Sequence, residues 1–198
     1  MSPTTVSDED AIRLSLDPTV RSWVMQKSHK TAEEERAWGS ALWTEVSRRV
    51  PPGGKRYHSN WSGNLGEQVI RGLLLRAGKD VASKTRYRVG SWVKETDLMT
   101  QDGFFEIKTR SWFTPGSAGL KVPGVFVDYG PMLDKLKGTG KAVYVVSMAF
   151  QEVECREKYE LFGSKSEART AFLDLCERNG MVFLAASDMM RDVESLDL

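Results

Sequence analysis

The sequence predicts an α/β domain in which a mixed sheet is flanked by helices, preceded by an N-terminal helical extension. Apolar residues recur at helical spacing over residues 7–49 and 65–77, whereas residues 82–109 read as strands. Residues 142–150 form an apolar run that is typical of a strand buried on both faces. A chain of 198 residues fits one domain with such a core.

The extension, which we place at residues 1–62, is predicted to be helical as far as Arg49. Ser7 is expected to cap its first helix, because acidic residues fill the turn that follows. Three apolar residues then recur at i, i+4 and i+8: Trp38, Leu42 and Val46. The proline and glycine stretch at 51–54 ends this region.

A further helix is predicted over residues 65–77, at the start of a core placed at 63–198. Asn64 and Glu67 form a capping-box pattern at its beginning, and Gly78 is a typical stop.

Three strands follow in quick succession, at 82–89, 91–100 and 104–109. The last two are expected to be joined by a tight turn at Asp102-Gly103. The order predicts an antiparallel meander after a helix.

The rest of the chain begins with residues 110–126, which are rich in Gly, Pro and Ser and are predicted to form a binding loop. A short helix at 130–138, the buried strand at 142–150, a helix at 164–180 and a strand at 181–186 are expected to follow.

Composition excludes several classes of protein. No apolar run approaches the roughly 18 residues of a membrane span, and the N-terminus does not resemble a signal peptide. Two cysteines, Cys155 and Cys176, provide no disulfide framework, and two histidines, His29 and His58, form no zinc pattern with them. We therefore expect a cytoplasmic protein that does not associate with a membrane.

Charge is uneven along the chain. Residues 66–145 carry 13 Lys and Arg against 8 Asp and Glu, although the net charge of the chain is +1. This distribution is compatible with a module that faces a polyanion, and equally with charges scattered over a solvated surface.

Three charged residues of the hairpin are predicted to converge. If the turn has two residues as proposed, Asp97 faces Lys108 and Met99 faces Glu106. Paired side chains share a face, so Asp97, Glu106 and Lys108 gather within roughly 7–8 Å. A change of one residue in loop length would move Asp97 to the other face.

Two carboxylates at this separation repel each other unless a cation or a proton lies between them. Oxygen ligands favour Mg²⁺, with Mn²⁺ as a substitute, over zinc. A divalent ion held by carboxylates activates water, and Lys108 beside it can orient or deprotonate that water or stabilise charge on phosphorus. The set suits phosphodiester hydrolysis.

Asp97, followed by Glu106 and Lys108 in the form Glu-Ile-Lys and preceded by a helix with Glu67, resembles the PD-(D/E)XK nuclease superfamily, which includes most type II restriction endonucleases. The order helix, three strands, helix and strand over residues 63–149 is similar to the core of that superfamily. The resemblance implies a restriction-endonuclease-like α-β-β-β-α-β core.

The resemblance also assigns roles to these residues. Asp97 and Glu106 would bind the metal ion, Lys108 would be the catalytic lysine, and Glu67 would complete the metal site. Thr96 stands where proline is usual, which is a common variation.

Other roles remain open for the same residues. Asp97, Glu106 and Lys108 could form an ion pair across a solvated sheet face. Glu67 could act only as the capping-box acid, and Glu95 is expected to be a strand-end charge rather than a ligand.

Nucleic-acid contacts are expected from the loop after the catalytic lysine and from the first strand, against the alternative of ordinary solvated side chains. These residues are Arg110, Ser111, Trp112 and Lys121 in the loop, and Lys84, Arg86 and Arg88 on the strand.

The resemblance implies a Mg²⁺-dependent endonuclease that cuts duplex DNA in a sequence-specific way, as type II enzymes do. Cutting both strands at one place requires two active sites, so a homodimer is expected. Alternatives that share the same cluster are a branched-DNA resolvase or repair nuclease and an RNA-cutting endonuclease of the cap-snatching type. An alternative of another class is a catalytically silent scaffold of the same fold that only binds nucleic acid or another protein.

Overall fold

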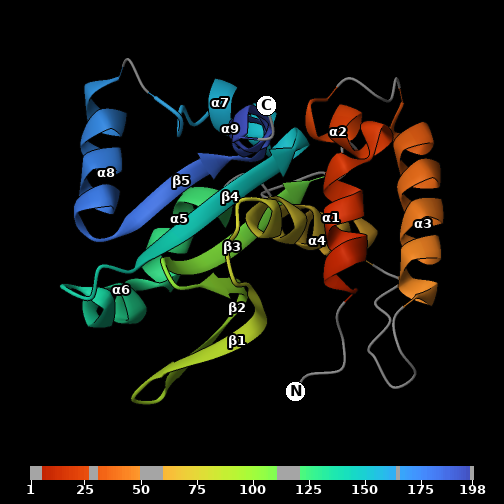
Figure 1. The fold of residues 1–198 in the computed structure, drawn as a ribbon. Helices are drawn as coiled ribbons and strands as arrows, with labels where there is room; N and C mark the ends of the chain where they lie inside the picture. Colours follow the sequence, from red (N-terminus) through yellow and green to blue (C-terminus); the bar gives the residue numbers. More distant parts are fainter. Residues whose placement is uncertain (1–5, 27–30, 50–59, 111–120, 164–165, 197–198) are drawn as a thin grey trace.

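The computed structural model describes residues 6–26, 31–49, 60–110, 121–163 and 166–196. Within these ranges five strands form one mixed sheet in the order β1-β2-β3-β4-β5, with helices on both sides (Figure 1). A mixed α/β fold is therefore confirmed. No helix in the described ranges is long and apolar enough to cross a membrane.

The sheet combines an antiparallel half with a parallel half. β1 pairs with β2 and β2 with β3 in antiparallel fashion, whereas β3, β4 and β5 run parallel. All five lie within about two residues of their predicted positions. Their bounds are β1 (Ala82–Val89), β2 (Trp92–Thr100), β3 (Gly103–Arg110), β4 (Ala142–Ala149) and β5 (Met181–Ala185).

The predicted helical extension consists of three helices in its described parts, and Ser7 caps the first as expected, through a hydrogen bond from the Asp10 N–H. Asp17 then ends α1 and caps α2. The helices before the sheet are α1 (Asp8–Leu16), α2 (Pro18–Val24), α3 (Ala32–Arg48) and α4 (Trp61–Arg76).

The second half of the chain contains more helix than predicted. α5 begins at Lys121, inside the predicted loop, while α7 begins directly at the end of β4 and α9 directly at the end of β5. The helices are α5 (Lys121–Asp128), α6 (Gly130–Leu136), α7 (Phe150–Glu157), α8 (Glu167–Arg178) and α9 (Ala186–Leu196).

The predicted capping box at the start of α4 is wrong. Asn60 is the N-cap, and its side chain accepts a hydrogen bond from the Gly63 N–H at 3.4 Å. Trp61 and Leu65 are both buried, so the apolar face of the helix starts one turn earlier than predicted. Glu67 consequently lies in the body of the helix and not at its N3 position.

The predicted β2–β3 register is also wrong. Thr100 pairs with Gly103 and Met99 with Phe104, so the two turn residues are Gln101 and Asp102. Gly103 is the first residue of β3 and pairs with Ala142 of β4. Glycine is required there because a Cβ would lie 2.0 Å from the Ala142 carbonyl oxygen. The loop still has two residues, so every side chain keeps its predicted face.

Two apolar clusters cover the two faces of the sheet. Phe105 and Ile107 of β3 pack in one cluster with α1–α4 and α9, while Phe104 packs in the other with α5, α6 and α8. In the first cluster the rings of Trp23, Trp38 and Trp61 lie 5.6–6.2 Å apart between centroids.

The proposed division at residues 62 and 63 falls inside α4, and the first cluster joins helices on both sides of it to the sheet. The separation into extension and core stays a prediction.

Gly72 lets α4 approach α1, because a Cβ at this position would lie 2.1 Å from the Ala11 carbonyl oxygen. We expect Gly72→Ala to lower the free energy of unfolding by about 1–3 kcal/mol, since backbone of α1 must move. Urea unfolding measures this. Gly124→Ala is the matched control, because nothing lies within 4 Å of a Cβ there. It should be neutral or stabilising, and an equal loss in both variants would contradict the packing argument.

Candidate active site

The candidate site begins where β2 and β3 stop pairing. Their last ladder pair is Leu98 with Phe105. The next residue of β2, Asp97, turns one carboxylate oxygen to the backbone of β3 and accepts a hydrogen bond from the Ile107 N–H at 2.8 Å. This bond fixes the carboxylate against the adjacent strand and leaves its second oxygen for other partners.

Glu106 and Lys108 lie two residues apart on β3, so their side chains share one face of that strand. Both lie close enough to Asp97 for their charges to shift its pKa. The Lys108 ammonium donates a hydrogen bond to one oxygen of Glu106, and the Tyr129 hydroxyl donates to the other. Tyr129, between α5 and α6, is completely buried. The predicted convergence of Asp97, Glu106 and Lys108 is therefore present, with a tyrosine added.

Glu67 reaches the same place from α4. Gly66 permits this approach, because a Cβ there would lie 2.2 Å from the Thr109 hydroxyl oxygen of β3. The Lys84 ammonium of β1 then joins the two acids, at 2.6 Å from Glu67 Oε1 and 3.2 Å from Asp97 Oδ1. Four elements, α4, β1, β2 and β3, thus supply the charged groups of the cluster, and the α5–α6 junction adds Tyr129.

Burial and mutual repulsion govern the charges here. Burial raises the pKa of Glu67 to about 7, and the nearby Asp97 carboxylate adds to this rise. Burial, together with repulsion from Glu106, raises the pKa of Asp97. Burial alone would lower the pKa of Lys84, but Glu67 and Asp97 outweigh it and raise that pKa. The cluster therefore holds more negative charge than its surroundings accommodate.

The donor set fits a hard divalent cation, because Glu67, Asp97 and Glu106 offer only oxygen atoms. Excess negative charge in a half-buried place is what such an ion would relieve. In the described ranges no three acidic, Cys or His side chains are arranged as metal ligands. The ammonium groups of Lys84 and Lys108 already bond these carboxylates.

The structure separates the predicted nucleic-acid contacts into three groups. Arg86, Arg88 and Lys121 are exposed. Lys84 is also exposed, but its ammonium bonds Glu67 and Asp97. Arg110 forms an ion pair with Glu154 and stacks on the Phe150 ring, with 12% of its side chain exposed. Ser111 and Trp112 lie outside the described residues, as do His29 and His58.

Other groups that the sequence singled out lie away from the cluster. Glu95 pairs with Arg86 at 3.1 Å on the exposed part of the hairpin. The thiols of Cys155 and Cys176 are free and buried.

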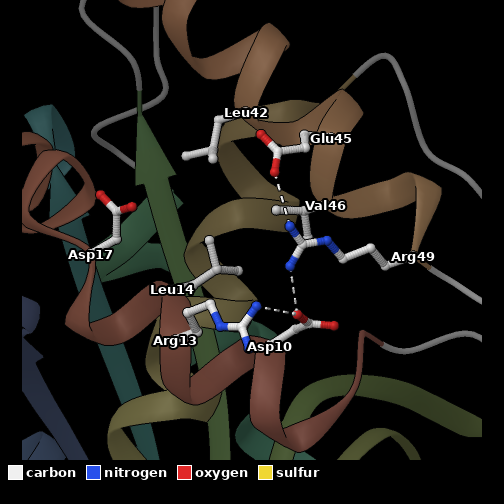
Figure 2. Close-up of a pocket in the computed structure, with 8 residues that line it drawn as sticks. All are labelled: Asp10, Arg13, Leu14, Asp17, Leu42, Glu45, Val46 and Arg49. Atoms are coloured by element: carbon white, nitrogen blue, oxygen red, sulfur yellow. Dashed lines mark hydrogen bonds and ion pairs between the residues drawn. The ribbon is translucent and has the colours of Figure 1, made fainter.

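A small pocket lies between α1 and α3 (Figure 2). None of the residues that line it belongs to the cluster of Glu67, Asp97 and Glu106. Its volume is about 120 Å³, below the roughly 300 Å³ at which ligand pockets begin. Arg49 spans it, with bonds of 2.8 Å to Asp10 and 2.9 Å to Glu45. These charges satisfy one another, so the pocket is a structural feature.

Sequence reasoning missed two features of the site: the presence of Tyr129, and the hydrogen bonds from Lys84 to Glu67 and Asp97. Tyr129 lies 23 positions after Glu106, and no local pattern links them. For Lys84 the alternation along β1 predicts only the face of the strand. Its backbone has φ 50, a left-handed conformation that is rare for lysine and is visible only in the structure.

Comparisons with known proteins add a distant structural likeness. No protein-family model matches the chain, and no curated protein matches it. The chain is similar to Can2 from Sulfobacillus thermosulfidooxidans, solved in complex with cyclic tetra-adenylate, with 12% sequence identity and a TM-score of 0.39. The match covers 96% of this chain and 50% of Can2, so the chain spans about half the length of that protein.

Glu67→Gln removes a carboxyl whose pKa is about 7 in the folded protein, whereas the ordinary value of 4.5 applies in the unfolded chain. The folded state binds more protons in this window, so Glu67 costs stability as pH rises through it. Relative to wild type, Glu67→Gln should therefore gain about 1–3 kcal/mol of unfolding free energy between about pH 5 and about pH 8.

Urea unfolding in the presence of EDTA measures this difference at each pH. Glu95→Gln, at an exposed acid of β2, is the matched control and should show no comparable trend. If the difference in unfolding free energy between Glu67→Gln and wild type stays constant with pH, the raised pKa of Glu67 is refuted.

Proposed function

We propose that the chain is a Mg²⁺-dependent endonuclease that hydrolyses DNA phosphodiester bonds, with the core and active site of the PD-(D/E)XK superfamily. One observation carries the proposal. Asp97, Glu106 and Lys108 from two neighbouring strands meet Glu67 from the preceding helix in one half-buried cluster. The order of α4, β1, β2, β3 and the parallel β4 also supports it.

The metal ion would be held by Asp97 and Glu106, with Glu67 as a further ligand. When bound, Mg²⁺ supplies Lewis-acid activation of water and stabilisation of charge on the phosphate. The raised pKa values of Glu67 and Asp97 are consistent with a place prepared for added positive charge. Mn²⁺ has the same ligand preference and would substitute.

The protein groups have separate tasks in this scheme. Lys108, with 26% of its side chain exposed, can orient the attacking water or stabilise negative charge on the phosphate. The Ile107 N–H fixes the orientation of Asp97. Tyr129 is a positioning residue, because its hydroxyl holds one oxygen of Glu106 and so sets the direction of the other.

DNA would be contacted by the exposed cations Arg86, Arg88 and Lys121, which suit backbone phosphates. Arg110 contributes less, because only 12% of its side chain is exposed, whereas Arg86 remains 77% exposed although it pairs with Glu95. A homodimer would place two such sites on the two strands of a duplex, as sequence-specific cutting of the type II kind requires.

Two other functions use the same cluster, and a third shares only the fold. A branched-DNA resolvase or repair nuclease and an RNA-cutting endonuclease differ only in substrate. A silent nucleic-acid-binding scaffold is disfavoured, because a binding surface gains nothing from burying carboxylates that repel one another.

Glu106→Gln should lower the rate of cleavage of duplex DNA in Mg²⁺ by at least about 100-fold, because it removes charge from the metal site. Gel analysis of phage-length DNA measures this, with Glu95→Gln as the control that should cut normally. Cutting by Glu106→Gln at the wild-type rate would refute the site.

The products of the wild-type protein answer a separate question. Discrete bands would indicate sequence-specific cleavage, and a smear would indicate cleavage without sequence specificity. A wild-type protein that cuts neither duplex DNA, branched DNA nor RNA would favour the scaffold.

Tyr129→Phe removes the hydrogen bond to Glu106 and keeps the ring. Because such a bond to a charged group contributes about 1.5–3 kcal/mol, kcat should fall by roughly 10–100-fold with KM for DNA unchanged. Tyr87→Phe is the control, since its ring packs edge-on against Phe104 in the same apolar cluster. An unchanged kcat in Tyr129→Phe, or a rise in KM alone, would contradict a positioning role.

A further inference from the structure

Lys84 is the one member of the cluster whose task the proposed hydrolysis leaves unexplained. It belongs to β1, one of the two edge strands of the sheet, and its ammonium lies within hydrogen-bond distance of two carboxylates from two other elements. Glu67 and Asp97 have only 17% and 18% of their side chains exposed, and the Lys84 ammonium hydrogen-bonds both of them.

The backbone at Lys84 is adapted to this contact. Its φ of 50 interrupts a strand whose ladder with β2 otherwise runs from Ala82 to Val89. A non-glycine residue held in this region costs roughly 1–3 kcal/mol and persists where the surroundings demand it. A lysine that served only as an exposed phosphate contact would need no such conformation.

We propose that Lys84 is the built-in counter-cation of this site and competes with a divalent ion for Glu67 and Asp97, so that it sets the affinity of the site for metal. The inference rests on the proposed metal site. The ammonium occupies the lone pairs of Glu67 Oε1 and Asp97 Oδ1 that an ion shared by these acids would need. With 36% of its side chain exposed on an edge strand, Lys84 can turn to solvent when an ion displaces it.

Lys108 contacts one of the proposed metal ligands, whereas Lys84 contacts two. Lys108 bonds Glu106, its neighbour on the same strand, whose second oxygen is held by Tyr129. Lys84 alone in the described cluster joins acids from α4 and β2. The two lysines therefore have different roles: Lys108 acts toward the substrate and Lys84 controls entry of the metal ion.

Calorimetric titration with Mn²⁺, in the absence of DNA, tests the inference. Lys84→Met and Lys84→Gln should bind Mn²⁺ at least about 10-fold more tightly than wild type, because no ammonium has to be displaced. Lys84→Arg keeps the charge and should bind as weakly as wild type. Lys79→Met is the matched control, because it removes a lysine from a 2.8 Å ion pair with Asp102 outside the site.

Thermal unfolding in EDTA gives a second readout. Lys84→Met should unfold at a lower temperature than wild type without metal, and added Mn²⁺ should raise its Tm by more than that of wild type. A purely structural lysine would lower stability without any gain in metal affinity.

The possible failures are distinct. Equal or weaker Mn²⁺ binding by both neutral variants overturns the role of Lys84 and leaves the proposed nuclease intact. Absence of Mn²⁺ binding in every variant overturns the metal site and, with it, both proposals. Tighter binding in the Lys84 variants of a protein that cuts no nucleic acid supports the Lys84 inference and overturns the nuclease.

Discussion

The burial of three carboxylates in one place is the constraint on which the candidate site depends. Acids that are withdrawn from water next to one another resist ionisation, as the raised pKa values of Glu67 and Asp97 indicate. Hydrogen-bond donors from separate elements stabilise these carboxylates. The cluster therefore links the edge strand β1, the strands β2 and β3, and the helices on both faces of the sheet. These donors are the ammoniums of Lys84 and Lys108, the Ile107 N–H and the Tyr129 hydroxyl.

Close packing of the backbone makes this gathering possible. Gly66 allows α4 to lie against β3, which brings Glu67 within reach of β1 and β2. Gly103 allows β3 to approach β4 at the start of their parallel ladder. Each glycine is required by what lies beside it, and a larger side chain at either place would move the acids relative to one another.

Most of the fold could be predicted from periodicity, whereas the site could be predicted only as far as strand alternation carries. The turn lies one residue earlier than predicted, yet Asp97 kept its face because the loop still has two residues. Asn60 replaced Asn64 as the cap, since both offer the same chemistry and only packing of Trp61 chooses between them. Tyr129 could not be foreseen, because its contact with Glu106 is set by tertiary packing of the α5–α6 junction.

The central claim is that Asp97 and Glu106 form a cation site, and the most direct measurement is the anomalous scattering of Mn²⁺ in crystals of the protein grown with that ion. The account predicts an anomalous peak in contact with the carboxylates of Asp97 and Glu106, with Lys84 turned away from Glu67. Well-ordered carboxylates with no peak between them, or Mn²⁺ bound only elsewhere, would contradict it.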